Sequence, residues 1–155
     1  MQEIPIWQRL LACLVYLLPW SHAIEFGGPL ISIFPALRWL QFLALPLISV
    51  QTLIPLGGFV MFLLLYSLVA RNPKVPYLIR FNALQAILLS IVLVVISYAF
   101  QSVLVPLMGI FLLKTLSNTI FLGCVALFGF VLVQCLRGKD ADIPPLSEAV
   151  RMQLM

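Results

Sequence analysis

Acidic side chains, which carry proton transfer in many membrane proteins, are scarce in this sequence and lie outside its apolar stretches. The chain has five of them: Glu3, Glu25, Asp140, Asp142 and Glu148. Proton-coupled transport and intramembrane aspartyl proteolysis need carboxylates within the bilayer, where such groups are costly and usually functional. The sequence therefore favours neither activity.

Metal and nucleophilic chemistry have no better support. His22 is the one histidine among 155 residues, and the three cysteines, Cys13, Cys124 and Cys135, form no CxxC pair. A zinc site needs several His, Cys or acidic ligands at set spacing. Motifs such as GxSxG, HExxH, the phosphate loop and the dinucleotide fingerprint are also missing. We predict a protein that is not an enzyme, with no catalytic residue, no metal and no cofactor other than bound lipids.

Polar residues within the apolar stretches are not scattered but gather on one side of each predicted helix. On a helical wheel, small and polar residues fall on one arc in each of two stretches. The first stripe comprises Asn82, Ala83, Ala86, Ser90, Ser97 and Gln101, and the second comprises Thr115, Asn118, Ala126 and Gly129. Gln85 lies off the first arc but forms a polar cluster with Arg80 and Asn82, and it is a further candidate for a helix seam or a substrate path. Such stripes let helices approach closely and hydrogen-bond to one another. The alternative is that they line a hydrated path for a polar or extended substrate.

Arg71 and Arg80 flank the turn-forming run 72–76, and Lys74 lies within it. Basic side chains at the end of a membrane helix commonly contact lipid phosphates. We predict that these three residues are lipid-phosphate anchors. The basic residues form no long run, so a nucleic-acid partner is not predicted.

The elements that must position these residues are apolar helices. Hydrophobic residues make up 63% of the chain and charged residues 9%, and residues 39–70, 81–113 and 115–136 contain no charge at all. Each uncharged interval exceeds the roughly 20 residues that a helix needs to cross the hydrocarbon core of a bilayer. The apolar runs are continuous and do not alternate, which favours helices over a membrane β-barrel.

The predicted fold is an all-α integral membrane protein, a bundle of four transmembrane helices. A single membrane domain covers residues 1–139, and residues 140–155 form a short tail. Between the first two spans, Gly and Pro residues interrupt residues 25–50, which predicts an amphipathic segment at the membrane surface. The predicted spans are residues 6–20, 52–70, 77–101 and 116–136.

Basic residues orient this bundle. With four spans, seven lysines and arginines fall on one side, and only Arg38 and Lys114 fall on the other. Because basic residues accumulate in cytoplasmic loops, both termini are predicted to lie on the cytoplasmic or stromal side.

Several segments of the chain are similar to a known family. They are residues 9–19, the Phe34-Pro35 step, Arg71-Asn72-Pro73, residues 79–87 and the tail residues 143–149. The most specific of them is Arg80-Phe81-Asn82-x-x-Gln85-Ala86. Together they resemble the twenty-kilodalton subunit family of the Tic translocon, which occurs in the chloroplast inner envelope and has cyanobacterial and plastid-encoded homologues.

This resemblance implies a membrane core of preprotein import with both termini on the stromal or cytoplasmic side. Its partners would be membrane lipids, other membrane subunits or further copies of the chain, and a transiting preprotein. Relatives often carry Asp where this chain has His22 and Ser90. With no Ser- and Arg-rich transit peptide in the sequence, we expect a cyanobacterial plasma or thylakoid membrane, or a plastid inner envelope.

Three functions are compatible with these observations. The first is a non-enzymatic component of a protein translocon, acting as a channel or scaffold core. The second is a structural or assembly subunit of a larger membrane complex, photosynthetic complexes included. The third is a small-solute transporter, which the lack of intramembrane carboxylates disfavours.

Overall fold

The computed structural model describes residues 4–155, and this part of the chain contains helices and no strand. Short 3₁₀ segments (η1, η2) and π-helical segments (η3, η4) connect or extend the α-helices. In chain order the elements are α1 (Ile6–Leu14), α2 (Leu17–Ala23), η1 (Ile24–Gly27), α3 (Gly28–Ile33), η2 (Pro35–Arg38), α4 (Trp39–Leu53), α5 (Gly57–Leu64), η3 (Leu65–Ala70), α6 (Tyr77–Ala99), η4 (Phe100–Leu104), α7 (Val105–Leu107), α8 (Ile110–Leu136) and α9 (Leu146–Leu154).

Within residues 4–155, four continuous helical runs are long and apolar enough to cross a membrane: Ile6–Ile33, Pro35–Leu53, Tyr77–Leu107 and Ile110–Leu136. A further apolar helix, Gly57–Ala70, is shorter. The predicted all-α, multi-pass membrane fold is therefore confirmed.

Three of the helix bounds differ from those of the predicted spans. The first run continues past Trp20 to Ile33, because Pro29 occupies the first turn of α3, where a missing N–H costs little. In the same way Pro106 lies in the first turn of α7, so the third run extends to Leu107. The fourth run begins at Ile110, six residues before the predicted start, and ends at Leu136 as predicted.

The region of the predicted second span shows the largest difference. Helix α4 ends at Leu53, and α5 begins at Gly57, so a turn interrupts residues 52–70. Leu56 adopts a left-handed conformation with φ of 57°, and Gly57 lies so close to the Gln51 carbonyl that a β-carbon would collide with it. The preceding run, Pro35–Leu53, belongs to the segment that was predicted to lie at the membrane surface; it forms a helix of spanning length with Pro46 in its interior.

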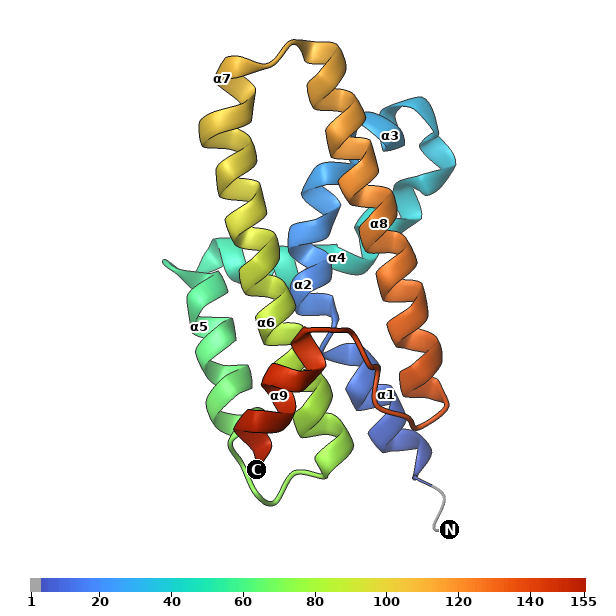
Figure 1. The fold of residues 1–155 in the computed structure, drawn as a ribbon, viewed down its shortest axis with the longest axis vertical. Coiled ribbons are helices and arrows are strands. Elements are labelled where there is room, and N and C mark those ends of the chain that lie inside the picture. Colours follow the sequence, from blue (N-terminus) through green and yellow to red (C-terminus); the bar gives the residue numbers. More distant parts are fainter. Residues whose placement is uncertain (1–3) are drawn as a thin grey trace.

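Helices α1 and α2 form the centre of the bundle (Figure 1). They pack on both α6 and α8, which run antiparallel to each other and are joined through α7. Helix α4 crosses beside α2, and α5 with η3 descends along α6. The start of α1, the turn between η3 and α6, the end of α8, and α9 all lie at one end of the bundle (Figure 1).

An aromatic cluster joins the central helices. The Trp20 ring lies edge-on to Phe128 of α8 at 5.1 Å between centroids, and at 6.2 Å from Phe121. Tyr16 makes a second edge contact with Phe128 at 6.4 Å. The Trp20 indole N–H also donates a 3.1 Å hydrogen bond to the Leu40 carbonyl of α4. One buried side chain thus connects α2, α4 and α8.

Gly27 allows η1 to approach α8 closely. A β-carbon at Gly27 would lie 2.8 Å from Cε2 of Phe121, a ring that is itself 1% exposed. Because this ring has no room to move, we expect Gly27→Ala to lower the free energy of unfolding by about 1–3 kcal/mol, as overpacking typically does. Gly28→Ala is the matched control, since a β-carbon there would lie more than 4 Å from every atom of residues 4–155 beyond its chain neighbours and its own helix backbone. Denaturation in detergent micelles, followed by circular dichroism, measures the free energy of unfolding. Equal values for the two variants would contradict this close packing.

Candidate functional site

Asn82 lies at the centre of the polar groups in the bundle and is fully buried. Its side-chain oxygen accepts a 3.0 Å hydrogen bond from the Tyr16 hydroxyl and lies 3.4 Å from the Cys135 thiol of α8. Its amide nitrogen donates to the Leu78 carbonyl, one turn earlier in α6, at 2.8 Å. A single amide thereby links the first, third and fourth long helical runs.

Gln85, one turn further along α6, is also fully buried. Its amide nitrogen donates a 2.7 Å hydrogen bond to the Ala141 carbonyl, and its oxygen lies 3.4 Å from the Ser147 hydroxyl. Ser147 in turn accepts the Ile143 N–H at 2.7 Å. Asn82 and Gln85 therefore have different partners: the first joins helices of the bundle, and the second holds the C-terminal tail.

The end of α8 directs the tail toward Gln85. Gly138 adopts φ of 68°, and the N–H groups of Gly138 and Lys139 bond to the carbonyls of Cys135 and Gln134. This pairing is a Schellman motif, which requires a left-handed residue that glycine provides without strain. The tail then returns across α6, where α9 packs on it. Burial raises the pKa of the Asp140 carboxyl in this tail more strongly than nearby Arg151 lowers it.

Removing the Gln85 amide should loosen the tail. We expect Gln85→Leu to reduce the protection of α9 amides against hydrogen exchange by about 1–3 kcal/mol, because the Ala141 carbonyl loses its 2.7 Å donor and keeps only the Ser147 hydroxyl at 3.4 Å. Gln101→Leu is the matched control, since Gln101 is exposed in η4. Equal exchange of α9 in the two variants would contradict this role of Gln85.

The remaining residues of the first predicted stripe divide into a buried and an outer group. Ala86 is fully buried, and Ser90 is 5% exposed, with its hydroxyl bonded to the Ala86 carbonyl at 2.9 Å. Ser97 is half-buried and donates to the Glu25 carboxylate at 3.1 Å, whereas Gln101 is exposed. Only the half of the stripe nearest Asn82 lies inside the bundle.

The second predicted stripe lies beside the packed face of α8. Thr115 and Gly129 are exposed, and Asn118 is half-buried with a side-chain oxygen that has no hydrogen-bond partner among residues 4–155. The packed face consists instead of Ser117, Phe121, Cys124, Phe128, Val131 and Cys135. The two stripes do not face each other, because α1 and α2 lie between α6 and α8.

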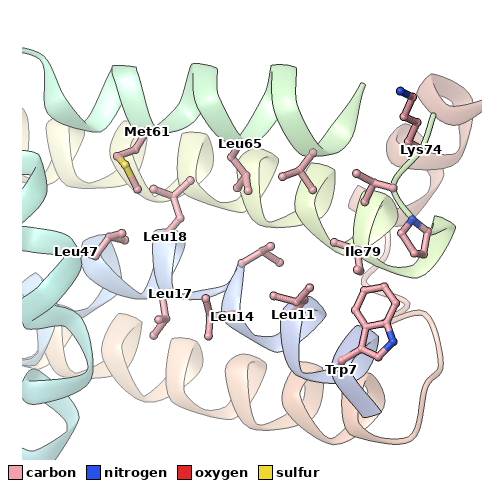
Figure 2. Close-up of a pocket in the computed structure, with 14 residues that line it drawn as sticks. Trp7, Leu11, Leu14, Leu17, Leu18, Leu47, Met61, Leu65, Lys74 and Ile79 are labelled. Atoms are coloured by element: carbon pink, nitrogen blue, oxygen red, sulfur yellow. The ribbon is translucent and has the colours of Figure 1, made fainter. Parts of the chain in front are cut away.

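The three predicted lipid anchors line two different hollows. Arg80 is half-buried, donates its Nε–H to the Ala70 carbonyl at 3.1 Å, and shares a polar pocket with Arg71. Lys74 lies at one end of a separate groove of about 470 Å³ (Figure 2). In Figure 2, leucines of α1 and α2 line one side of this groove, and Met61 and Leu65 line the other.

This groove and a second hollow beside Ser90 are almost entirely apolar. The second hollow is formed by α2, α5 and α6, with Phe59, Phe62 and Val95 among its walls. Apolar walls suit acyl chains or apolar helices better than water or ions. Within residues 4–155 no three His, Cys, Asp or Glu side chains gather in a way that could hold a metal ion.

Comparison with known proteins identifies the family. Residues 1–150 match the family model described as "Chloroplast import apparatus Tic20-like". A Tic20 family protein of Synechocystis sp. is 36% identical over 147 residues, which cover 94% of this chain and 92% of the relative. Protein TIC 20-v, chloroplastic, of Arabidopsis thaliana is 28% identical over 95% of this chain and 71% of its own length. The Tic20 family protein Ycf60 of Porphyra purpurea is 29% identical over 94% of this chain and 75% of its own length. This chain is therefore a multi-pass membrane protein of the Tic20 family, as the sequence resemblance implied.

Proposed function

We propose that this protein is a non-enzymatic scaffold subunit of a Tic-type protein translocon, and that any polypeptide path runs along its surface and not through its own core. Membership of the family supports the coarser statement, a component of such a translocon. The choice between scaffold and channel rests on the arrangement of polar groups within the chain.

The observation that carries the proposal is the closure of the polar centre. Asn82 and Gln85, the most polar groups inside the bundle, are fully buried and use their amides on Tyr16, Leu78 and Ala141. A hydrated path needs polar groups that remain free to bond with water or substrate. Side-chain amides that already form hydrogen bonds to neighbouring segments stabilise the packing of those segments.

The outer surface offers the contacts that a scaffold needs. Beyond Ser90, α6 has a strongly exposed apolar face on which Val95 is 61% and Tyr98 75% exposed. On α8, Leu122 is 54% exposed. In a membrane these faces contact lipid, another subunit or a second copy of the chain. A path bounded by several chains would use such faces, whereas four helices packed on one another enclose no wide lumen.

Site-specific photo-crosslinking tests the proposal. A crosslinking residue at Val95 or Leu122, both outside the core, should capture a preprotein arrested during translocation, together with neighbouring subunits. The same crosslinker at Ala86, which is fully buried, is the matched control and should capture only positions within the chain.

Two results would count against the proposal in different ways. Capture of the arrested preprotein from Ala86 would overturn the scaffold role in favour of a channel through this chain. Capture of one constant neighbour from Val95 and Leu122, with no preprotein at either position, would overturn the translocon role in favour of a structural subunit.

A further inference from the structure

A polar pocket lies between the end of η3, the first turns of α6, and α9. Its volume is about 450 Å³, and it differs from the other hollows in having mostly polar walls. The lining residues are Tyr66, Ala70, Arg71, Arg80, Leu84 and Gln153.

The pocket carries two positive charges that the described chain does not neutralise. Among residues 4–155 the one ion pair joins Arg151 to Asp142, so neither Arg71 nor Arg80 has a carboxylate partner there. Arg80 is half-buried, and its Nε–H is already bonded to the Ala70 carbonyl at 3.1 Å. That bond orients the guanidinium and leaves its terminal N–H groups for another acceptor.

The position of the pocket identifies the class of acceptor. Ala70 ends the apolar helix Gly57–Ala70, and Tyr77 begins the run Tyr77–Leu107, so Arg71 and Arg80 flank the turn where apolar helices end. At such a level of a bilayer lie the phosphate groups of lipids. Guanidinium groups match phosphate oxygens in a fixed, two-pronged geometry.

We propose that this pocket binds the phosphate of an anionic phospholipid, with Arg71 and Arg80 as its two cationic ligands. Tyr66 and Gln153 supply a hydroxyl and an amide at the rim, and Leu84 supplies an apolar wall for the glycerol end of the lipid. The site is separate from the groove at Lys74, which has apolar walls. It also goes beyond the scaffold role, which does not depend on it.

The site is complete only when α9 is docked, because Gln153 belongs to that helix. Val150 of α9 is fully buried, and the Arg151 guanidinium lies 5.9 Å from the centre of the Phe81 ring. A ligand held between η3, α6 and α9 therefore favours the docked tail. Lipid binding should slow hydrogen exchange in α9.

Native mass spectrometry of the full chain released from nanodiscs tests the site. Discs that contain phosphatidylglycerol and phosphatidylcholine in equal amounts should yield protein with retained phosphatidylglycerol. Arg71→Gln, which leaves the Arg80 bond to Ala70 in place, should weaken this retention about fivefold, the effect of about 1 kcal/mol per basic residue near the surface. Arg38→Gln is the matched control, since Arg38 is an exposed arginine of η2, far along the chain from the pocket.

Experiments with inorganic phosphate show whether the ligand of the pocket is a lipid or a soluble anion. Inorganic phosphate at millimolar concentration should not displace the lipid, and added without the lipid it should not protect α9. Equal retention of the two lipids, an unchanged Arg71→Gln variant, or protection of α9 by inorganic phosphate alone would each overturn the proposal. None of these results depends on translocation, so failure of the lipid site would leave the scaffold role, which crosslinking tests, unaffected.

Discussion

Replacing Trp20 with alanine should lower the free energy of unfolding by about 3–5 kcal/mol, the usual cost of deleting a buried aromatic side chain. The indole contacts Phe121 and Phe128 of α8, and its N–H reaches the Leu40 carbonyl of α4. Lipid is as apolar as these side chains, so the loss comes from packing contacts and an unfilled cavity, not from transfer to water. Titration with sodium dodecyl sulfate in mixed micelles, followed by circular dichroism, measures it.

Trp20→Phe is the control for this prediction. Phenylalanine keeps a ring between α2 and α8 but removes the hydrogen bond to Leu40. Interhelical hydrogen bonds in membrane proteins average about 0.6 kcal/mol and reach about 1.7 kcal/mol. Trp20→Phe should therefore cost clearly less than Trp20→Ala. Equal losses for the two variants would mean that the ring contacts contribute little.

The second prediction concerns the closed polar centre. Asn82→Leu should lower the free energy of unfolding by about 1–3 kcal/mol, because it leaves the buried Tyr16 hydroxyl without its acceptor. The same titration measures the effect.

A double-mutant cycle with Tyr16→Phe separates this effect from a general loss of packing. Tyr16→Phe deletes the hydroxyl, so the combined variant leaves no unpaired group between these two positions. The double variant should be less destabilised than the sum of the single variants, since neighbours that share a bond are not additive. Strict additivity would contradict a Tyr16–Asn82 hydrogen bond in the folded protein.

The membrane fold could be predicted from the sequence because the signal is simple. Uncharged intervals longer than a bilayer-crossing helix leave few alternatives, and the described part of the chain contains four helices of spanning length. The helix bounds could not be predicted as well, since Pro29 and Pro106 suggested interruptions but occupy first turns. A proline in the first turn of a helix lacks only an N–H that has no partner within the helix, so it does not end the helix there.

The sequence predicted only part of the candidate site. Asn82 and Ala86 of the first stripe, and the nearby candidate Gln85, lie inside the bundle, whereas Thr115 and Gly129 of the second stripe are exposed. The packed face of α8 combines the Phe121 and Phe128 rings with Ser117, Cys124, Val131 and Cys135. A helical wheel drawn for small and polar residues alone does not reveal those two rings.

The partners of Asn82 and Gln85 were missed for two different reasons. Tyr16 and Trp20 are four residues apart and share a helical face, a signal that could have indicated an aromatic seam. The return of the tail to Gln85 has no local signal, because Ala141 contributes a backbone carbonyl and its side chain plays no part in the bond.

Water access to Ala86 tests most directly whether the polar centre is closed. In a variant whose Cys13, Cys124 and Cys135 are replaced by alanine, Ala86→Cys would be treated in opened membranes with a water-soluble maleimide. Asp142→Cys, at an exposed position of the tail, is the control for reagent access. A closed centre predicts rapid labelling of the control and labelling of Ala86→Cys only after denaturation. Comparable rates at the two positions in the native membrane would contradict the scaffold account.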